Sequence, residues 1–387
     1  MHKVDVLAYK FDVDNTDSFN EDIISYSRNS IILNWSLKKI WVQYKPANIE
    51  FKKTTMNFFN IREQKWRYFF SPLITIVYVI QVFKFFLPIC WKFRPKIFVV
   101  ENFVEGLIAG IIRKCNLVDK TIYLPADWFA GHKYKKLLSN IANNLLFPCV
   151  DYWACKLNDV VIDRQGFDIT EMRNKYWGMK IPTTKRQFIQ QLRIQTTNIC
   201  IDKKRPNICF IGEVRKDSGL DIAIKSLGNI LKHQNIILKV IGHKRLYYDY
   251  FINLSKEYDV TRYVKFLGFV ERKDFNQVLS DCFCGINILS NLNSYSTVGC
   301  PAKITYYLQY LLPVIVTEGI GERMLLDIRN NKLGLIIRPT EDEFVEAVLK
   351  IYNDQNFYRK NIVSYIKSFP KTGIIDFLRD EDLKSKQ

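Results

Sequence analysis

Two cations follow a short apolar run in a pattern that suits phosphate binding. Residues 210–227 read FIGEVRKDSGLDIAIKSL, an apolar run followed by a glycine, a polar loop and an amphipathic segment. The first N–H groups of a helix carry a partial positive charge, and Arg215 and Lys216 would add full charges beside them. The pattern predicts an anion site after this strand. Taken alone, it is equally compatible with a solvated turn between a strand and a helix.

A second set of polar residues lies on a predicted helix that leads straight into a strand. Residues 300–322 read CPAKITYYLQYLLPVIVTEGIGE, in which the helix begins at Pro301 and a glycine turn follows the strand. Lys303 falls on the first turn of this helix and Tyr306 falls one turn later, so both are expected near the same edge of a sheet. The backbone N–H groups of Gly319–Gly321 could add hydrogen bonds to an anion there.

Acids and histidines near predicted strand ends form a third set of candidates. A carboxylate at the carboxyl end of a strand can orient a hydroxyl group that attacks a substrate. Each of these residues is also compatible with a plain role as a helix cap or a loop residue. The candidates are Glu101, Glu105, Asp127 and His132 in the first half of the chain, and His243, Glu318 and Glu322 in the second half.

The elements that must position these residues alternate between strand and helix. In the second half, runs rich in Ile and Val are separated by segments of helical periodicity, which predicts six β-α units and a doubly wound parallel sheet. The first half is less regular, and a hairpin is left open for residues 30–60. The strands are expected at 207–212, 236–242, 264–268, 284–289, 313–317 and 334–338, and earlier at 4–9, 96–102, 120–125 and 159–163, with long helices at 103–115 and 133–147.

This alternation predicts two α/β domains with a linker between them. Residues 181–206 show no sustained period, so the linker is placed there. We expect an N-terminal domain over 1–180, a C-terminal domain over 207–365 and a tail over 366–387. Two such domains would leave a cleft between the carboxyl ends of their sheets, where ligands bind in folds of this kind.

The charge of the chain is concentrated in its first quarter. The net charge is +18, and residues 38–96 hold twelve Lys or Arg against two acids. A basic, tryptophan-containing region suits an anionic membrane or a nucleic acid, although a plain solvated face is also compatible. Residues 68–91 are interrupted by polar residues and fall short of the about 20 apolar residues of a spanning helix, so we expect a domain helix whose outer face touches lipid. Nine scattered cysteines and the lack of an apolar leader predict a reducing, cytoplasmic setting.

Taken in order, these motifs resemble a known family. The segments FIG…SGLDIAI, LKVIGH, VKFLGFVERKDFNQVLSDCFCGINIL, PAKITYYLQYLLPVIVTEGIGE and GLII resemble the C-terminal domain of GT-B-fold glycosyltransferases of family 4, the glycosyl transferases group 1. The first half of the chain resembles the N-terminal domain of that family less specifically. The resemblance implies two Rossmann-like doubly wound α/β domains that face a central cleft.

The resemblance also implies a chemistry. A nucleotide-sugar donor, linked to UDP or GDP, would bind the C-terminal domain, and a hydroxyl of a glycan or lipid-linked saccharide would attack its anomeric carbon. The configuration would be retained, with no metal and no further cofactor, in polysaccharide biosynthesis at an anionic membrane surface to which the enzyme is peripherally bound. The donor-binding candidates are Gly212, Arg215, Lys216, His243, Lys303, Tyr306, Glu318, Gly319, Gly321 and Glu322, and the catalytic candidates are Asp127, Glu101 and His132.

Some positions depart from the family pattern. Glu213 and Ser218 stand where relatives commonly carry Arg and Lys, and Tyr306 stands where many carry a glutamate that contacts the ribose. The glycine-rich turn after the first strand is also missing. These departures keep a catalytically inactive GT-B scaffold open as an alternative. Epimerisation of a sugar nucleotide lacks the paired acids and histidines it would need, and nucleic-acid binding rests on charge alone, without a recognition motif.

Overall fold

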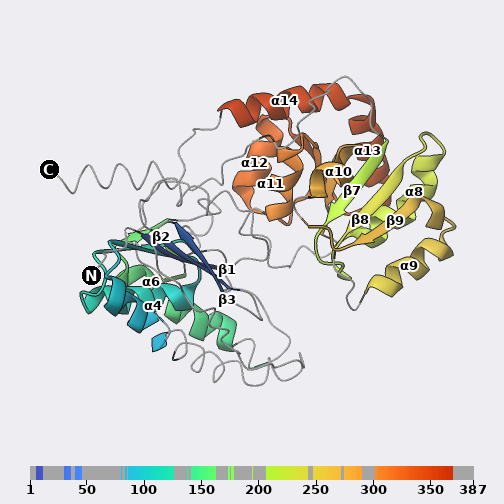
Figure 1. Cartoon of the computed structure of the whole chain (residues 1–387). Coiled ribbons are helices and arrows are strands. Elements are labelled where there is room, and N and C mark those ends of the chain that lie inside the picture. The colour runs from blue at the N-terminus through green and yellow to red at the C-terminus, as the bar shows by residue number, and fades with distance from the viewer. Residues whose placement is uncertain are drawn as a thin grey trace. The chain divides into compact units, whose positions relative to one another are not determined.

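The computed structural model divides the chain into two compact units. The first unit comprises Met1–Gln190 with Thr372–Gln387, and the second comprises Gln191–Lys371. Each contains one six-stranded sheet with helices (Figure 1). The structure describes residues 6–11, 30–35, 40–45, 80, 83–84, 86–125, 137, 141–162, 173–174, 176–177, 194, 206–242, 247–271, 274–289 and 301–368.

The sheet of the first unit has the order β3-β2-β1-β4-β5-β6. Strands β2 and β3, at one edge of the sheet, pair antiparallel as a hairpin. The remaining strand pairs are parallel. The hairpin left open for residues 30–60 is therefore present, and the four strands predicted in the first half of the chain are confirmed. The strands are β1 Val6–Phe11, β2 Ser30–Trp35, β3 Ile40–Lys45, β4 Ile97–Val100, β5 Lys120–Tyr123 and β6 Val160–Val161.

Two helices of the first unit pack tightly against each other. Helix α4 (Phe103–Lys114) is capped by Asn102, whose side chain accepts a hydrogen bond from the N–H of Val104. A Cβ atom at Gly106 would lie 2.9 Å from the ring of Tyr123, so only glycine lets α4 approach β5 this closely. The second helix, α6 (Phe147–Leu157), supplies Asn158 just after its end, and the amide of Asn158 donates to the carbonyl of Gly106 at 2.7 Å.

The long helix predicted for residues 133–147 continues beyond its expected end. A π-helical segment, η1 (Ala142–Leu146), runs directly into α6, so the chain is helical from residue 141 to Leu157. Proline removes a backbone N–H and normally disrupts the interior of a helix, and Pro148 follows directly after the predicted end. Here the wider π-helical turn precedes Pro148. In an α-helix the residue at position 148 would donate its N–H to the carbonyl of Asn144, but proline has no N–H. The hydroxyl of Tyr176 donates to that carbonyl instead.

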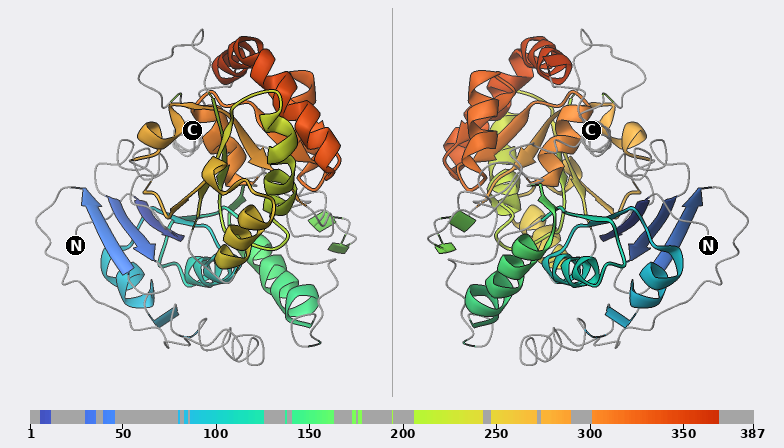
Figure 2. Two further views of the ribbon diagram at one scale, coloured as in Figure 1. Left: turned by 90° about the vertical axis from the view of Figure 1, so that its right-hand side faces the viewer. Right: turned by 90° about the vertical axis from the view of Figure 1, so that its left-hand side faces the viewer.

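The second unit contains the six β-α units that the sequence predicts. Its sheet is parallel throughout, in the order β12-β11-β10-β7-β8-β9, with helices on both faces (Figure 2). The strand order reverses at β7, which is flanked by β8 and β10. Loops after such strands diverge and leave space for a ligand. The strands are β7 Asn207–Ile211, β8 Ile237–Ile241, β9 Val264–Gly268, β10 Cys282–Asn287, β11 Val314–Thr317 and β12 Gly334–Ile337.

Alternate residues of β7 enter two separate cores. Ile208 and Phe210 pack with α8 and α13, whereas Cys209 and Ile211 pack with α11 and α14 on the other face. Strands buried on both faces explain the continuous apolar runs in this half of the sequence. The helices are α8 Leu220–Leu231, α9 Tyr248–Glu257, α10 Phe275–Leu279, α11 Ala302–Gln309, α12 Glu322–Asn330, α13 Glu341–Asn353 and α14 Gln355–Ser368, with a 3₁₀ turn, η2, at Thr261–Tyr263.

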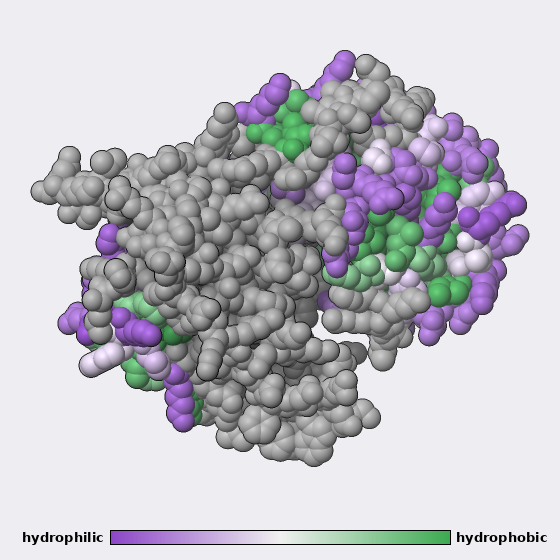
Figure 3. Space-filling model, in the orientation of Figure 1, coloured by the Kyte–Doolittle hydropathy of each residue, from purple (hydrophilic) through white to green (hydrophobic). Residues whose placement is uncertain are grey.

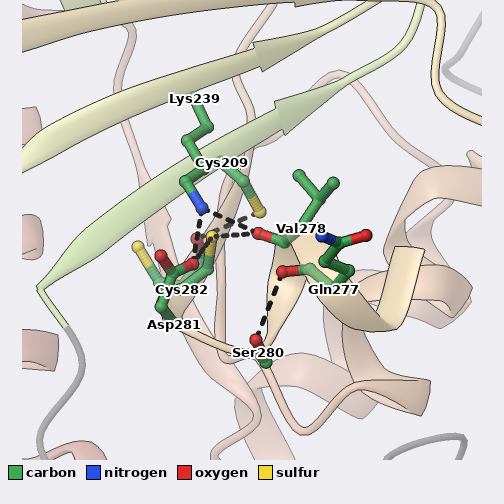
Figure 4. A network of polar contacts seen from close by, with 8 residues as sticks. Cys209, Lys239, Gln277, Val278, Ser280, Asp281 and Cys282 are labelled. Carbon is green, nitrogen blue, oxygen red and sulfur yellow. Dashed lines mark hydrogen bonds and ion pairs between the residues drawn. The ribbon is translucent and has the colours of Figure 1, made fainter. Parts of the chain in front are cut away.

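A partly exposed polar network joins β8 to the start of β10. Lys239 on β8 donates to the carboxylate of Asp281 at 2.6 Å and to the carbonyl of Val278 at 2.9 Å (Figure 4). Cys209 and Cys282 lie beside this pair, and burial raises the pKa of the Cys209 thiol well above its usual value. Thiols of high pKa react poorly. The network therefore ties the middle of β8 to the residue that precedes β10.

The predictions for the segment 68–91 and for the basic region 38–96 can be checked in part. Among the described residues, no helix is long and apolar enough to cross a membrane. Of the segment 68–91, residues 86–91 are helical, with Phe86 and Cys90 buried and Trp91 exposed, as expected of a domain helix. On the face shown in Figure 3, the described surface of the second unit is mostly hydrophilic. Most of residues 38–96 and of the linker 181–206 lies outside the described residues, and the predicted domain boundaries stay predictions.

Candidate functional site

Two glycines bring the loops after β7 and β8 into contact. The N–H of Gly212 donates to the carbonyl of Ile241 at 2.9 Å, and Gly212 adopts φ +139°, a backbone conformation that favours glycine. A Cβ atom at Gly242 would lie 2.0 Å from the carbonyl oxygen of Gly212. Both positions therefore require glycine, and they hold the Gly212 turn at the carboxyl edge of the sheet.

Lys303 lies directly over this turn. Its ammonium nitrogen, Nζ, would be 3.2 Å from a Cβ at Gly212 and is 4.6 Å from the centre of the Phe210 ring. Desolvation, assisted by repulsion from Arg215 and opposed by Asp217, lowers the pKa of Lys303 to about 8. At neutral pH the side chain is therefore still charged. It is a poorly solvated cation, which gains more from meeting an anion than an exposed lysine does.

The loop after the Gly212 turn contains an internal ion pair. The guanidinium of Arg215 binds both carboxylate oxygens of Asp217, with Nε 2.9 Å from Oδ1. Burial raises the pKa of Asp217, but the hydrogen bond and the charge of Arg215 outweigh this and lower it overall. Lys216 and Glu213 are exposed. Asp217 thus holds Arg215 within the loop, and no carboxylate in the described part of the chain forms an ion pair with Lys303.

Helix α8 begins at the end of this loop without a side-chain cap. Its N-cap residue is Gly219 with φ +70°, and a Cβ atom there would lie 2.5 Å from the Cβ of Ile288. Ser218, at the place of the family's lysine, donates from Oγ to the carbonyl of Arg215 at 2.6 Å. Ser218 therefore tightens the turn, and the positive end of α8 faces the edge where β7 and β10 diverge.

Tyr307 is a structural member of the site that the sequence analysis did not identify. Its hydroxyl accepts a hydrogen bond from the N–H of Ile211 at 2.8 Å and donates to the carbonyl of Ile286 at 3.1 Å. The last paired residues of β7 and β10 are Phe210 and Ile286, so the hydroxyl bridges the two strands where their ladder ends. A Cβ at Gly285 would be 2.2 Å from the tyrosine ring. The available signal was its spacing of four residues from Lys303, which places both on one helix face.

Removing this hydroxyl is expected to destabilise the second unit. Tyr307→Phe keeps the ring but leaves the buried N–H of Ile211 and the carbonyl of Ile286 without this partner, at a cost of about 1–3 kcal/mol. Urea unfolding measures the change. Tyr258→Phe, an exposed tyrosine at the end of α9, is the matched control and should change the unfolding free energy little. Equal effects of the two variants would contradict the bridging role.

The structure also places the remaining candidates of the second unit. Tyr306 is partly buried and its ring packs edge-on against Phe275, with centroids 5.9 Å apart. Glu318 and Glu322 are exposed on either side of the turn, in which Gly319 and Gly321 are buried. Gly321 is the N-cap residue of α12, which has no side-chain cap. The contacts thus bring Gly212, Arg215, Asp217 and Lys303 together, while the ring of Tyr306 packs against Phe275 on α10.

Fewer of the candidates in the first unit can be placed. Glu101 follows the carboxyl end of β4 and is buried, and Glu105 is fully buried in the first turn of α4. Asp127 and His132, and His243 of the second unit, lie outside the described residues. Within the described ranges, no three His, Cys, Asp or Glu side chains are grouped as metal ligands would be.

Comparisons with known proteins agree on the architecture. Residues 195–369 match the family model described as glycosyl transferases group 1. No curated protein matches the sequence of the chain. Among solved structures, sucrose-phosphate synthase from Thermosynechococcus elongatus is 13% identical with a TM-score of 0.65, covering 99% of both chains.

Two other similar proteins were solved with bound ligands. Anabaena Alr3699/HepE, solved in complex with UDP, is 11% identical with a TM-score of 0.62 over 99% of this chain and 100% of its own. A UDP-forming α,α-trehalose-phosphate synthase from Burkholderia xenovorans, in complex with glucose 6-phosphate, is 10% identical with a TM-score of 0.59 over 98% and 99%. At such identities the likeness shows the fold, which is that of GT-B proteins.

Proposed function

We propose that the chain is a glycosyltransferase that transfers a sugar from a UDP- or GDP-linked donor to a glycan or lipid-linked saccharide. The match of residues 195–369 to the model of the glycosyl transferases group 1 and the GT-B fold support this proposal. The observation that carries this proposal is the position of Lys303 over the Gly212 turn. A poorly solvated cation, an open glycine backbone and the uncapped start of α8 meet at one edge of the sheet. This combination suits the diphosphate of a sugar nucleotide.

The proposed role of Lys303 is to stabilise the leaving diphosphate. When the bond between the anomeric carbon and the diphosphate breaks, negative charge grows on the departing phosphate oxygens. A cation placed beforehand in a poorly solvated position stabilises that charge more strongly than water does. Phe210 and Gly212 keep the ammonium of Lys303 over the turn. In this proposal, protein cations and backbone N–H groups neutralise the diphosphate without a metal.

Arg215 is proposed to join the diphosphate by leaving Asp217. The pair is partly exposed and its members are only two residues apart, so exchanging the carboxylate for a phosphate costs little. Lys216 is exposed in the same loop and adds charge to the same region. Asp217 would then act as a placeholder that keeps Arg215 ordered before the donor arrives. Relatives commonly carry Arg and Lys at the positions of Glu213 and Ser218. In this proposal Arg215 supplies the positive charge that those two positions lack.

The acceptor is proposed to bind the first unit, with retention of the anomeric configuration. Glu101 lies at the carboxyl end of β4, the edge where ligands bind in sheets of this type. Its carboxylate would orient the attacking hydroxyl, and Asp127 and His132 remain predictions for the same role. The UDP complex of Anabaena HepE and the glucose 6-phosphate complex of the Burkholderia synthase support a nucleotide donor and a saccharide acceptor.

Thermal-shift measurements with nucleotides test this proposal. A ligand that binds only the folded protein stabilises it by about 2.7 kcal/mol at a concentration one hundred times its dissociation constant. We expect one of UDP, GDP and ADP to raise the melting temperature more than the others, and its sugar conjugates to act in the same way. Absence of any shift with all three nucleotides and their common sugar conjugates would contradict the proposed donor site.

A further inference from the structure

One polar side chain of the second unit is buried at the end of a strand without a hydrogen-bond partner. Asn287 is the last residue of β10 and is 2% exposed. Among the residues that the structure describes, no group accepts a hydrogen bond from its amide nitrogen, Nδ2. A buried N–H that gives up water without gaining a partner destabilises a protein. Native proteins contain few such groups, and a functional role is one reason for keeping one.

The side chain of Asn287 lies on the face of the sheet that α11 covers. Asn287 is paired with Val316 of β11, and directly paired residues project from the same face of a sheet. Val316 packs in the core to which Tyr307 of α11 belongs. The preceding residue, Ile286, packs in the core on the other face, as the alternation along a strand requires. The amide of Asn287 therefore lies at the carboxyl edge of β10, on the side of α11.

Polar groups next to Asn287 are paired with one another. The hydroxyl of Tyr307 bridges the ends of β7 and β10 through two hydrogen bonds. The hydroxyl of Thr317, the last residue of β11, accepts a hydrogen bond from the N–H of Leu289 at 3.0 Å. These bonds tie the ends of β7, β10 and β11 together. The strand end that carries Asn287 is therefore fixed, and within the described residues its amide nitrogen remains a donor without an acceptor.

Strand β10 is the neighbour of the strand that leads to the Lys303 site. β10 pairs with β7, and neighbouring strands lie about 4.8 Å apart. Lys303 lies over Gly212, which directly follows β7. A sugar nucleotide has a sugar ring on each side of its diphosphate, the ribose on one side and the transferred sugar on the other. Since β7 is flanked by β8 and β10, a diphosphate at Lys303 would place one of these rings near the end of β10.

We propose that Asn287 binds the sugar-nucleotide donor, with its amide nitrogen donating a hydrogen bond to a hydroxyl oxygen of the ribose or of the transferred sugar. Lys303, Arg215 and the start of α8 supply positive charge for the diphosphate, whereas a neutral amide suits an uncharged hydroxyl. A buried donor also discriminates against a ligand that lacks the hydroxyl, because the donor then stays unpaired. Asn287 is thus a specificity-determining residue. This role rests on the proposed function and deepens it.

A second buried asparagine in the same sheet provides an internal control. Asn207, the first residue of β7, is 4% exposed, and its side-chain oxygen has no hydrogen-bond partner in the part of the chain that is described. It lies on the same face, because it alternates with Cys209 and Ile211, which pack in the core beneath α11. It lies at the amino end of the strand, however, opposite to the edge where ligands bind. Leucine at either position keeps the branched shape and removes the hydrogen-bonding groups.

Calorimetric titration of the two leucine variants tests this role. The probes are a nucleoside, its diphosphate and the conjugates of that diphosphate with glucose and mannose, for the base among uracil, guanine and adenine that gives the largest thermal shift. Asn287→Leu is expected to bind the probes that carry the contacted ring about tenfold more weakly. A loss already present with the nucleoside identifies the ribose, and a loss seen only with a conjugate identifies the transferred sugar. Asn207→Leu should bind every probe as the unchanged chain does.

Melting curves separate a binding role from a structural one. The amide of Asn287 has no partner to lose among the described residues, so Asn287→Leu should melt no lower than the unchanged chain. Asn287→Ala is titrated in parallel and should show the same loss of affinity, which keeps the test valid if leucine does not fit.

Three results would overturn the role of Asn287. They are unchanged affinity of both Asn287 variants for every probe, a loss that first appears with the diphosphate and so places the amide at the phosphates, and a melting temperature of Asn287→Leu that falls together with its affinity. If the unchanged chain binds none of the probes, the proposed function itself fails, and the role of Asn287 fails with it.

Discussion

Replacing Lys303 by methionine is expected to lower kcat/KM for the donor by about 10²–10³-fold, the usual consequence of removing one preorganised group that stabilises charge in a transition state. Methionine keeps much of the apolar stem over Gly212 and Phe210 but removes the ammonium group. The loss should therefore arise without unfolding. Steady-state kinetics with varied donor concentration, together with a melting curve of the variant, measure the effect.

The matched control is Lys350→Met, which removes an exposed lysine from the last turn of α13. It lowers the net charge by the same amount but lies away from the Gly212 turn, and its kcat/KM should stay within about twofold of the unchanged enzyme, as expected for a surface substitution. If both variants lose activity alike, the effect of Lys303 is one of net charge. If neither does, the diphosphate does not bind at this lysine.

The role of Lys303 also predicts how kcat/KM depends on pH. The charged form of Lys303 is the one that binds an anion, and its pKa in the free protein is about 8. We therefore expect kcat/KM to be highest below pH 8 and to fall as the pH rises through that value. The Lys303→Met variant should have a much lower kcat/KM, and this kcat/KM should no longer fall near pH 8. A profile of unchanged shape in the variant would show that another group titrates.

The second large expected effect concerns stability of the first unit. Arg173 is buried, donates to both oxygens of Asp151 at 2.7 and 2.8 Å, and lies over the ring of Tyr123, whose hydroxyl also donates to Asp151 at 2.7 Å. Arg173→Met leaves the carboxylate of Asp151 buried with one neutral donor. Breaking a buried pair on one side costs about 3–5 kcal/mol. Urea unfolding of the first unit should show a shift of this size.

A partly exposed ion pair in the same unit provides the comparison. Arg113 donates to Asp159 at 2.9 Å, and both side chains are about one-third exposed. Arg113→Met should cost no more than about 1 kcal/mol, because solvent screens such pairs. The double variant Asp151→Asn/Arg173→Met should recover part of the loss, since no uncompensated charge remains. An Arg173→Met variant as stable as Arg113→Met would contradict the buried network.

The alternation of strands and helices could be predicted from the sequence because its cause is local. Runs such as NICFIG and IILKVIG are apolar on both sides since each strand is covered by helices on both faces. The proximity of Gly212, Arg215 and Lys303 could also be predicted, because they belong to segments whose order along the chain is distinctive. Their convergence follows from a parallel sheet, in which the carboxyl ends of all strands share one edge.

Other features depend on contacts between distant segments. The bridging role of the Tyr307 hydroxyl was not predictable, because its two hydrogen-bond partners come from β7 and β10, at the place where the pairing of these strands ends. The helix that continues past Pro148 was missed for a similar reason: the hydroxyl of Tyr176, far along the chain, donates to the carbonyl of Asn144, four residues before that proline. The packing of Tyr306 on Phe275 was likewise not indicated by any local pattern, and its expected place at the donor stays a prediction.

The proposed position of the donor's diphosphate beneath Lys303 is tested most directly by calorimetric titration of two ligands. One is the nucleoside diphosphate that stabilises the protein most, and the other is the same nucleoside without phosphate, titrated into the unchanged chain and into Lys303→Met. We predict that the variant binds the diphosphate about tenfold more weakly or worse, because a charge-assisted contact is lost, while its affinity for the nucleoside is unchanged. An equal change for both ligands, or no change for either, would contradict the placement of the diphosphate at Lys303.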